Sequence, residues 1–231
     1  MIVLQSLSKH YRRNTLIIKA LDRVDLSIPK NEFVVVRGPS GSGKTTLLLS
    51  VGGMLHPTSG GIKVDNQDIY ALDKKKLTRF RARKIGFVFQ LFHLIPYLTV
   101  LENALLPTVT DSSEKQRYGG EAMRLLRLLN LEDRASHYPA ELSAGEKQRT
   151  AIARAMIKKP DLILADEPTG NLDPQNAVEI AKCLAEIHRD GCTIIVVSHG
   201  HDCDLYADRI ILLDKGRIIS DKKSNRDHTG G

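Results

Sequence analysis

The chain has 231 residues, of which 42% are hydrophobic and 26% charged, and this balance is ordinary for a globular protein that buries a core. No apolar run approaches the roughly 18 residues of a membrane span, and the start of the sequence is too short in apolar residues for a signal peptide, so we expect a cytosolic protein. The formal net charge of +7 favours polyanionic partners, namely a nucleotide, anionic lipid or nucleic acid.

The predicted elements form three blocks along the chain. Short β-rich runs separated by turns predict a strand-rich N-terminal subdomain, and these runs are residues 2–4, 24–28, 33–36 and 62–64. A strand at 85–89 follows, and from about 92 to 159 the apolar spacing turns helical. The last third returns to buried strands at 162–165 and 193–197, with a helix between them. Continuous apolar strands alternating with helices predict a parallel sheet covered on both faces, whose ligands gather at the carboxyl ends of the strands.

A glycine-rich segment, GPSGSGKTT, follows the predicted strand at 33–36. Gly38, Gly43, Lys44 and Thr45 fit the spacing of the phosphate-binding loop G-x-x-x-x-G-K-[ST], and four matched positions disfavour a turn that binds nothing. The glycines let successive N–H groups point inward, and the helix that begins near Lys44 adds its positive end. Lys44 would reach the β- and γ-phosphates, and the Thr45 hydroxyl would hold Mg²⁺. The predicted nucleotide ligands here are Gly38, Pro39, Ser40, Gly41, Ser42, Gly43, Lys44, Thr45 and Thr46.

Polar side chains stand where the predicted strands end. Asp166 and Glu167 follow a buried strand, and two carboxylates at such a place are costly unless they face a cation or a reacting water. We expect Asp166 to bind Mg²⁺ and Glu167 to deprotonate the attacking water. His199, after the next buried strand, could contact a γ-phosphate oxygen or fix that water, and Gln90 could touch the metal or its water.

The cysteines give no sign of a disulfide or a zinc site. Cys183, Cys192 and Cys203 are odd in number and form no CxxC pair, which is typical of reduced thiols. A zinc site of His199, His201 and Cys203 is disfavoured, because no second ligand pair with zinc spacing exists elsewhere in the sequence.

The segment LSAGE at 142–146 indicates a second phosphate site. Ser143 and Glu146 have the spacing of a capping box, so the plain interpretation is a well-formed helix start. Gly145, however, stands in the first turn, where glycine costs about 1 kcal/mol relative to alanine. Close approach of a ligand to the backbone would explain this glycine, because a serine hydroxyl, free N–H groups and the positive helix end bind phosphate.

Much of the positive charge lies in residues 74–84, which read KKKLTRFRARK. A solvated helix face is favoured over a dedicated lipid or nucleic-acid patch. The chain has no Trp and only 5% aromatic residues, which weakens any role in base stacking.

Together these motifs resemble the ATPase subunit of ABC transporters. The resemblance covers residues 1 to about 219 and rests on 38–46, Gln90, 142–146, 162–167, 171–173 and His199. It implies an α/β fold, with a P-loop NTPase (RecA-like) parallel sheet core, an N-terminal antiparallel β subdomain and an inserted α-helical subdomain. The implied single domain has its core and β subdomain at about 1–91 and 160–220, its helical subdomain at about 92–159, and a disordered tail at 221–231.

The same resemblance implies ATP, Mg²⁺ and a second copy of the chain. Tyr11 falls where the family places an aromatic side chain that stacks on adenine. Two copies would pair head to tail, so that Ser143 and Gly145 of one chain close over ATP held by Lys44 of the other. Asp173 belongs to a loop that the family uses across the dimer, although it also has the features of an ordinary N-cap followed by proline.

Within the family, residues 88–107 and 164–173 are similar to the branch that serves lipoprotein release and macrolide export. Ala144 replaces the more usual glycine, and Gly200 follows His199 where an acid is common, but neither departure removes a catalytic group. The implied partner is an integral membrane permease, and the chain would dock on its cytoplasmic face as a peripheral protein of the inner membrane.

Residues 92–100 are apolar and include aromatic side chains, so we expect them to contact this permease. The alternative is a soluble ABC-type ATPase that acts on nucleic acid or the ribosome. It is disfavoured because the chain shows no long coiled coil, zinc module or second cassette, so no nucleic-acid partner is expected.

Overall fold

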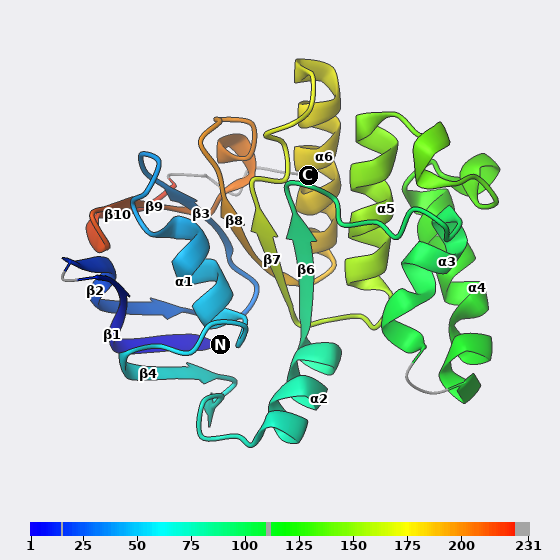
Figure 1. The fold of residues 1–231 in the computed structure, drawn as a ribbon. Helices are drawn as coiled ribbons and strands as arrows, with labels where there is room; N and C mark the ends of the chain where they lie inside the picture. The colour runs from blue at the N-terminus through cyan, green and yellow to red at the C-terminus, as the bar shows by residue number, and fades with distance from the viewer. Residues whose placement is uncertain (15, 110–111, 225–231) are drawn as a thin grey trace.

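The computed structural model describes residues 1–14, 16–109 and 112–224, and within them the chain forms two β-sheets flanked by helices (Figure 1). The larger sheet has the strand order β10-β9-β3-β8-β7-β6 and consists of β3 (Phe33–Arg37), β6 (Ile85–Phe89), β7 (Leu162–Asp166), β8 (Thr193–Val197), β9 (Arg209–Asp214) and β10 (Arg217–Lys223). The smaller sheet has the order β2-β1-β4-β5 and consists of β1 (Ile2–Arg13), β2 (Leu16–Ile28), β4 (Ser59–Val64) and β5 (Gln67–Asp68). Strands β9, β3, β8, β7 and β6 are parallel, whereas the smaller sheet is antiparallel throughout. The predicted parallel core and antiparallel N-terminal sheet are confirmed.

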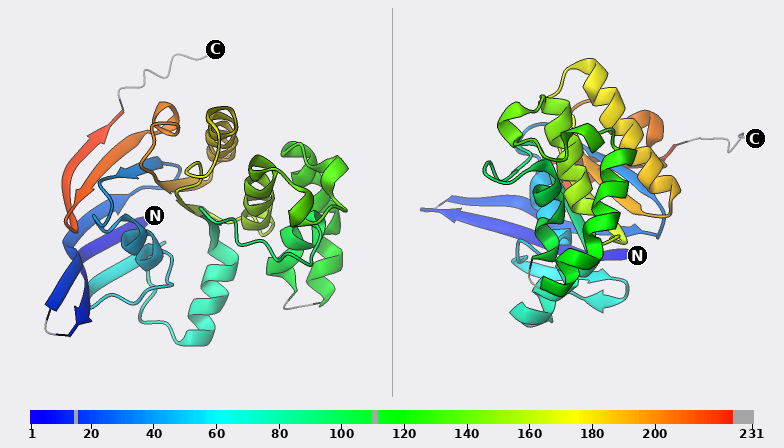
Figure 2. Two further views of the ribbon diagram at one scale, coloured as in Figure 1. Left: turned by 45° about the horizontal axis from the view of Figure 1, so that its top comes forward. Right: turned by 90° about the vertical axis from the view of Figure 1, so that its right-hand side faces the viewer.

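Helices connect the strands, and those of residues 100–156 form a separate group at one end of the molecule, drawn in green in Figure 2. The α-helices are α1 (Lys44–Val51), α2 (Lys74–Lys84), α3 (Val100–Leu105), α4 (Ser112–Leu128), α5 (Ala144–Met156) and α6 (Pro174–Arg189). Short 3-10 helices are η1 (Leu106–Thr108), η2 (Glu132–Arg134), η3 (Pro139–Glu141) and η4 (Asp204–Tyr206). Helices α3, α4 and α5 lie within the region of predicted helical spacing, and no helix of the described residues is both long and apolar enough to cross a membrane.

The central parallel strands bury both of their faces, because their side chains alternate between two hydrophobic clusters. In β3, Val34 and Val36 belong to the cluster that α1 and the smaller sheet share. Phe33 and Val35 belong to the opposite cluster, which includes residues of α5 and α6. The same alternation occurs in β7 and β8, so these strands are continuous apolar runs and are recognisable in the sequence.

The C-terminal strand contradicts part of the expected disordered tail. Residues 221–223 continue β10 and pair with β9, where Asp221 stands opposite Ile211. Two hydrogen bonds of 2.6 Å from the Arg209 guanidinium to the Asp221 carboxylate stabilise this polar end of the strand. Ser224 N donates to Asp208 O at 2.7 Å, and the remaining residues of the expected tail, 225–231, lie outside the described residues.

Candidate nucleotide-binding site

The loop between β3 and α1 has no room for side chains at two of its glycines. A Cβ at Gly38 would collide with the carbonyl oxygen of Leu213, and a Cβ at Gly43 with that of Ala20. Gly43 has a φ of 104° and precedes α1 without any side-chain cap, so N–H groups in the first turn of α1 remain available to an anion.

A buried hydroxyl in this loop points to a ligand. Ser42 is 2% exposed, and its Oγ has no hydrogen-bond partner among the described residues. Buried polar atoms in proteins are rarely left unpaired. An acceptor such as a phosphate oxygen, bound in the loop, fits this unpartnered donor.

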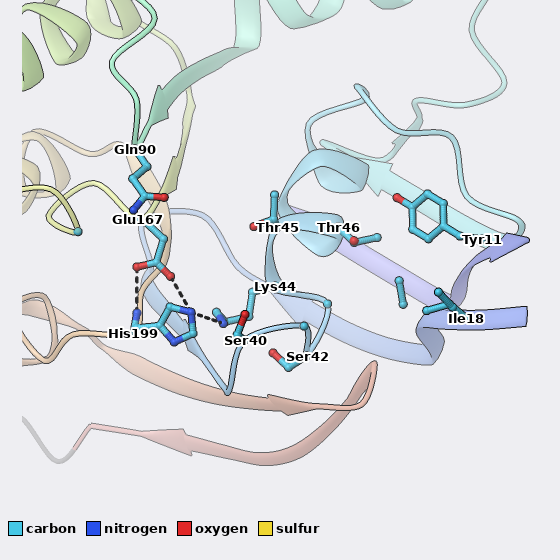
Figure 3. A pocket seen from close by; sticks show the side chains of 14 residues that line it. Tyr11, Ile18, Ser40, Ser42, Lys44, Thr45, Thr46, Gln90, Glu167 and His199 are labelled. Carbon is cyan, nitrogen blue, oxygen red and sulfur yellow. Dashed lines mark hydrogen bonds and ion pairs between the residues drawn. The ribbon is translucent and has the colours of Figure 1, made fainter. Parts of the chain in front are cut away.

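Lys44 places a buried cation against the loop. Its Nζ donates hydrogen bonds to the carbonyl oxygens of Gly38 (2.8 Å) and Pro39 (3.0 Å) and lies 3.2 Å from His199 Nε2 (Figure 3). Burial lowers the pKa of Lys44, while the nearby carboxylates of Glu167 and Asp166 act in the opposite direction. A phosphate group in the loop would compensate this burial of positive charge.

Thr45 and Asp166 bring two hard oxygen donors together. The Thr45 hydroxyl donates to Asp166 Oδ1 at 3.0 Å. Burial raises the pKa of Asp166, opposed by the Thr45 hydroxyl and by Lys44. Mg²⁺ prefers such oxygen ligands and usually completes its shell with phosphate oxygens and water, so this pair fits a magnesium ion bound together with a nucleotide. No cluster of three or more His, Cys, Asp or Glu that could hold a metal occurs in the part of the chain that the structure describes.

Glu167 and His199 form a second pair at the strand ends, facing Lys44 (Figure 3). The Glu167 carboxylate accepts a hydrogen bond from the His199 backbone N–H (3.0 Å), and its other oxygen lies 3.4 Å from His199 Nε2. Glu167 has a φ of 47°, which is unusual for a residue other than glycine, and its own N–H donates to Val197 O at 2.8 Å. Strained backbone of this kind clusters at functional sites and persists only where the surroundings hold it.

Gln90 reaches the same space from the end of β6. The backbone carbonyl oxygen of Gln90 accepts a hydrogen bond from Asn171 Nδ2 at 3.0 Å. A Cβ at Gly170 would lie 3.0 Å from the side-chain Nε2 of Gln90. The turn after β7 therefore holds Gln90 in position from one side.

These groups surround one cavity of about 620 Å³ (Figure 3). Its lining contains the predicted residues Tyr11, Ser40, Gly41, Ser42, Gly43, Lys44, Thr45, Thr46, Gln90, Glu167 and His199. Gly38, Pro39 and Asp166 do not line it but contact Lys44 or Thr45, as described above. Tyr11 is 41% exposed at the edge formed by β1 and β2, away from the phosphate loop.

Ser143, Gly145 and Asp173 do not line this cavity in the single chain. Ser143 caps α5 in a capping box: Glu146 N donates to its hydroxyl (3.3 Å), and its own N–H donates to the Glu146 carboxylate (2.8 Å). Asp173 caps α6 by accepting a hydrogen bond from Asn176 N at 3.0 Å. The sequence allowed a helix cap at Ser143 and an N-cap at Asp173, and the structure contains both caps.

Gly145 has an intramolecular explanation that differs from the expected one. A Cβ at this position would collide with the side-chain oxygen of Asn176, on α6. The Asn176 side chain therefore occupies the space beside Gly145 in its present rotamer, and a larger residue here would displace it.

Sequence reasoning missed several residues of the site. Ile18 and Ala20 line the cavity because Ile18 pairs with Tyr11 across β1 and β2, a register that the sequence alone does not reveal. Thr169, which is 5% exposed, donates to Asp202 Oδ2 at 3.1 Å and so ties the turn after Glu167 to the turn after His199. A Cβ at Gly200 would lie 2.9 Å from the same oxygen, so glycine leaves room for Asp202.

The fold and the site define a class. A phosphate loop between a parallel strand and a helix, with acidic residues at the end of a nearby strand, is the arrangement of P-loop nucleotide hydrolases.

Comparison with known proteins defines the family. The model of the ABC transporter family matches residues 21–170. The chain is 40% identical to the uncharacterized ABC transporter ATP-binding protein YvrO of Bacillus subtilis, over 99% of this chain and all of that protein. It is 43% identical to the ABC transporter ATP-binding protein MJ0796 of Methanocaldococcus jannaschii, over 96% of this chain and 97% of that one. It is 40% identical to the macrolide export ATP-binding/permease protein MacB of Chlorobaculum tepidum, but spans only 34% of its length.

Solved structures agree with these matches. A dimeric structure of the MJ0796 cassette in a post-hydrolysis state, bound to ADP and Pi, superimposes with a TM-score of 0.86 at 40% identity, covering 96% of this chain and 98% of that chain. The chain belongs to the ABC transporter family. Within it, the chain is an ATP-binding cassette with the fold of an ATPase, as the resemblance predicted.

Proposed function

We propose that the chain hydrolyses ATP with Mg²⁺ as a head-to-tail dimer, from the cytoplasmic side of a membrane, and so drives a separate permease. The observation that carries the proposal is the Glu167 carboxylate, held by the His199 N–H at 3.0 Å and facing Lys44 across one cavity. A base, a cation and a phosphate loop around a common space are the parts that phosphoryl transfer to water needs.

Each group has a role in this scheme. Lys44 and the loop N–H groups bind the β- and γ-phosphates. Water attacks the γ-phosphorus in line with the bond to the leaving β-phosphate oxygen, and Glu167 accepts the proton that the water loses. His199 orients Glu167 and donates to the γ-phosphate, and Gln90 orients the water. The products are ADP and inorganic phosphate.

Thr45 and Asp166 would hold the Mg²⁺, with Gln90 touching the metal or its water. When bound, Mg²⁺ neutralises developing charge on the phosphate oxygens. Tyr11 would stack on adenine, with Ile18 beside it in the cavity wall.

A dimer gives Ser143, Gly145 and Asp173 a role that the single chain does not. They lie outside the cavity that Lys44 lines, and Ser143 stands at the start of α5, where phosphate can bind. The cassette of MJ0796 has been solved as a dimer, which supports pairing of two copies of this chain. In such a pair, Ser143 and Gly145 would close over ATP bound to Lys44 of the other copy.

The permease contact is proposed for residues 92–100. Arg154 of α5 holds this segment, since its guanidinium donates to the carbonyl oxygens of Phe92 (2.7 Å) and His93 (2.5 Å). His93 also lines a mainly apolar cavity of about 340 Å³ together with Phe87 and Phe89. MacB, whose name joins macrolide export and an ATP-binding part to a permease, supports a membrane partner and a transporter of the macrolide-export type.

The decisive test is Glu167→Gln, which keeps the shape of the side chain but removes the base. ATP hydrolysis should fall by about a hundredfold or more, while the affinity for ATP persists. Glu179→Gln is the matched control, because Glu179 is a half-exposed carboxylate on α6 outside the cavity. If the Glu167→Gln variant binds ATP as poorly as a phosphate-loop variant such as Lys44→Ala, then Glu167 is a binding group and not the base.

No observation favours the alternative of a soluble ATPase that acts on nucleic acid or the ribosome. The relatives described above are ATP-binding proteins of transporters.

A further inference from the structure

Helix α2 carries an electrostatic arrangement that its own folding does not explain. Lys74, Lys75 and Lys76 occupy its first turn, and this turn contains no acidic residue. Positive charge is unfavourable at the N-terminus of a helix, where the macrodipole is positive. The Asp73 cap accepts a hydrogen bond from Lys76 N and forms an ion pair with the Lys76 ammonium, which leaves the other two lysines uncompensated.

Three of the basic side chains of α2 form one row, here called the basic stripe: Lys75, Arg79 and Arg83. They are spaced four residues apart, so they lie above one another on the helix surface, and all three are exposed. Their side chains form no hydrogen bond or ion pair with any described residue. Like charges at this spacing repel, so the stripe costs stability where it stands.

The opposite side of α2 fixes the helix and thereby the direction of the stripe. Leu77 and Phe80 pack against the hydrophobic cluster beneath the smaller sheet. Arg81 donates to Gly53 O at 2.9 Å, and Lys84 pairs with Asp161. The inner basic residues therefore have structural partners, whereas the stripe residues are held outward without any.

One cavity is lined both by α2 and by the segment that we assign to the permease. Ala82, between Arg79 and Arg83, lines the same apolar cavity as His93. Helix α2 lies where β6 begins, at the outer edge of the molecule (Figure 1). A permease docked at residues 92–100 would bring α2 close to its membrane.

We propose that the basic stripe binds the anionic headgroups of the lipid bilayer that surrounds the permease. Three cations within about 12 Å along one side of the helix suit a flat anionic surface. Lys74, Lys75, Lys76 and Arg79 also line a shallow hollow of about 470 Å³, together with Asp73, whose carboxylate pairs with Lys76, and the excess of positive charge there suits a phosphate headgroup. Nucleic acid is the less favoured occupant, because α2 exposes no aromatic side chain on which a base could stack. This inference rests on the proposed membrane partner.

The test is sedimentation of the full chain with vesicles of phosphatidylcholine alone or mixed with phosphatidylglycerol. The stripe variant carries Lys75→Gln, Arg79→Gln and Arg83→Gln. The matched control carries Lys182→Gln, Arg189→Gln and Lys222→Gln, which removes the same charge from exposed positions on α6 and β10. ATP hydrolysis should be unchanged in both variants, which shows that both are folded.

The wild-type chain and the control should bind the anionic vesicles, and none of the proteins should bind pure phosphatidylcholine. The stripe variant should partition roughly a hundredfold more weakly, about fivefold for each basic residue lost. Equal binding by the stripe variant, or an equal loss in the control, would overturn the proposal. A loss of binding to duplex DNA with vesicle binding intact would make the stripe a nucleic-acid site and overturn it as well.

Failure of this inference is distinguishable from failure of the proposed function. The vesicles contain no permease, so sedimentation reports on the stripe alone. Co-purification of a polytopic membrane protein with the unmodified chain reports on the permease alone.

Discussion

Two helix N-termini of this molecule are suited to bind phosphate, yet they are built in opposite ways. Helix α1 begins at Gly43 with no side-chain cap, next to the unpartnered hydroxyl of Ser42. Helix α5 begins at Ser143, whose hydroxyl and N–H are both engaged by Glu146. The Glu146 carboxylate also accepts a hydrogen bond from Arg134 at 2.9 Å.

The difference shows which end can act alone. The start of α1 leaves its donors free and needs a ligand to satisfy them. The capping serine of α5 is already engaged by Glu146, so a phosphate must add to an arrangement that is stable without it. This is what a shared site requires: one half binds the nucleotide in the single chain, and the other half remains stable until a second copy arrives.

The largest expected effect on ATP hydrolysis comes from a change at the uncapped start of α1. Among the described residues that line the cavity, Lys44 is the one lysine or arginine, so Lys44→Ala should lower ATP hydrolysis by roughly a thousandfold and weaken ATP binding with it. Lys147→Ala, on α5, is the control. The measurement is phosphate release, together with binding of a fluorescent ATP analogue. Turnover at the wild-type rate would remove the proposed role of Lys44.

A mixture of two inactive variants compares the two ends directly. Lys44→Ala disables the α1 end, and Ser143→Arg blocks the α5 end. In a two-fold dimer with composite sites, a mixed pair has one doubly damaged site and one intact site. Random pairing makes about half of the dimers mixed, so the mixture should recover up to roughly a quarter of wild-type activity per chain.

Light scattering supplies the second readout for this mixture. Glu167→Gln is added to both chains to stop turnover, and ATP-induced dimers should then increase on mixing. Dimers of equal yield in either pure variant, with no gain on mixing, would contradict a shared site and leave Ser143 as a helix cap.

An intermediate effect is expected at Thr169. Thr169→Val keeps the shape but leaves Asp202 without its hydrogen bond, which loosens the turn after Glu167 relative to the turn after His199. The maximal rate of hydrolysis should fall roughly tenfold with little change in KM, because binding is retained and positioning is lost. Thr169→Ser keeps the hydroxyl and should restore most of the rate. A change in KM alone would show that Thr169 acts on binding.

The smallest expected effect is on thermal stability and concerns the capped start of α5. The hydrogen bond from Arg134, ahead of those from Ser143, lowers the pKa of Glu146 from about 4.5 to about 2. Because the folded pKa is depressed, the ionised group adds stability above about pH 4.5 and loses this contribution as the pH falls toward about 2.

Glu146→Gln keeps a hydrogen-bonding side chain in the capping box but removes the charge. The melting temperature should drop by about 3 °C near neutral pH, and the gap to the wild type should close as the pH falls through this window. Calorimetry across this pH range measures the gap. A difference that is independent of pH would show that the charge of Glu146 adds nothing.

The phosphate loop and the strand-end residues could be predicted because local spacing determines them. Gly38 to Thr46 lie between a buried strand and a helix, and Asp166, Glu167 and His199 each follow an apolar run. A parallel sheet brings such strand ends together whatever the rest of the chain does.

Contacts between distant segments could not be predicted in this way. Ile18 faces the cavity because of the pairing register of β1 and β2, and Asn176 occupies the space beside Gly145 because α5 packs on α6. The polar end of β10 has no apolar pattern to indicate a strand, and only its pairing with β9 and the contact between Asp221 and Arg209 hold it in the sheet.

Arg154 connects α5 to the segment that we assign to the permease. This side chain is partly buried, and it donates hydrogen bonds to the carbonyl oxygens of two consecutive residues, Phe92 and His93, which both have positive φ. Eleven residues separate Arg154 from Ser143, which is about 17 Å along a helix. A displacement of residues 92–93 would act on Arg154 through these two hydrogen bonds and would tilt α5 as a rigid helix. A tilt of about 5° would displace the far end by about 1.5 Å, half the length of a hydrogen bond, which would engage or release a phosphate in the site that we propose at Ser143.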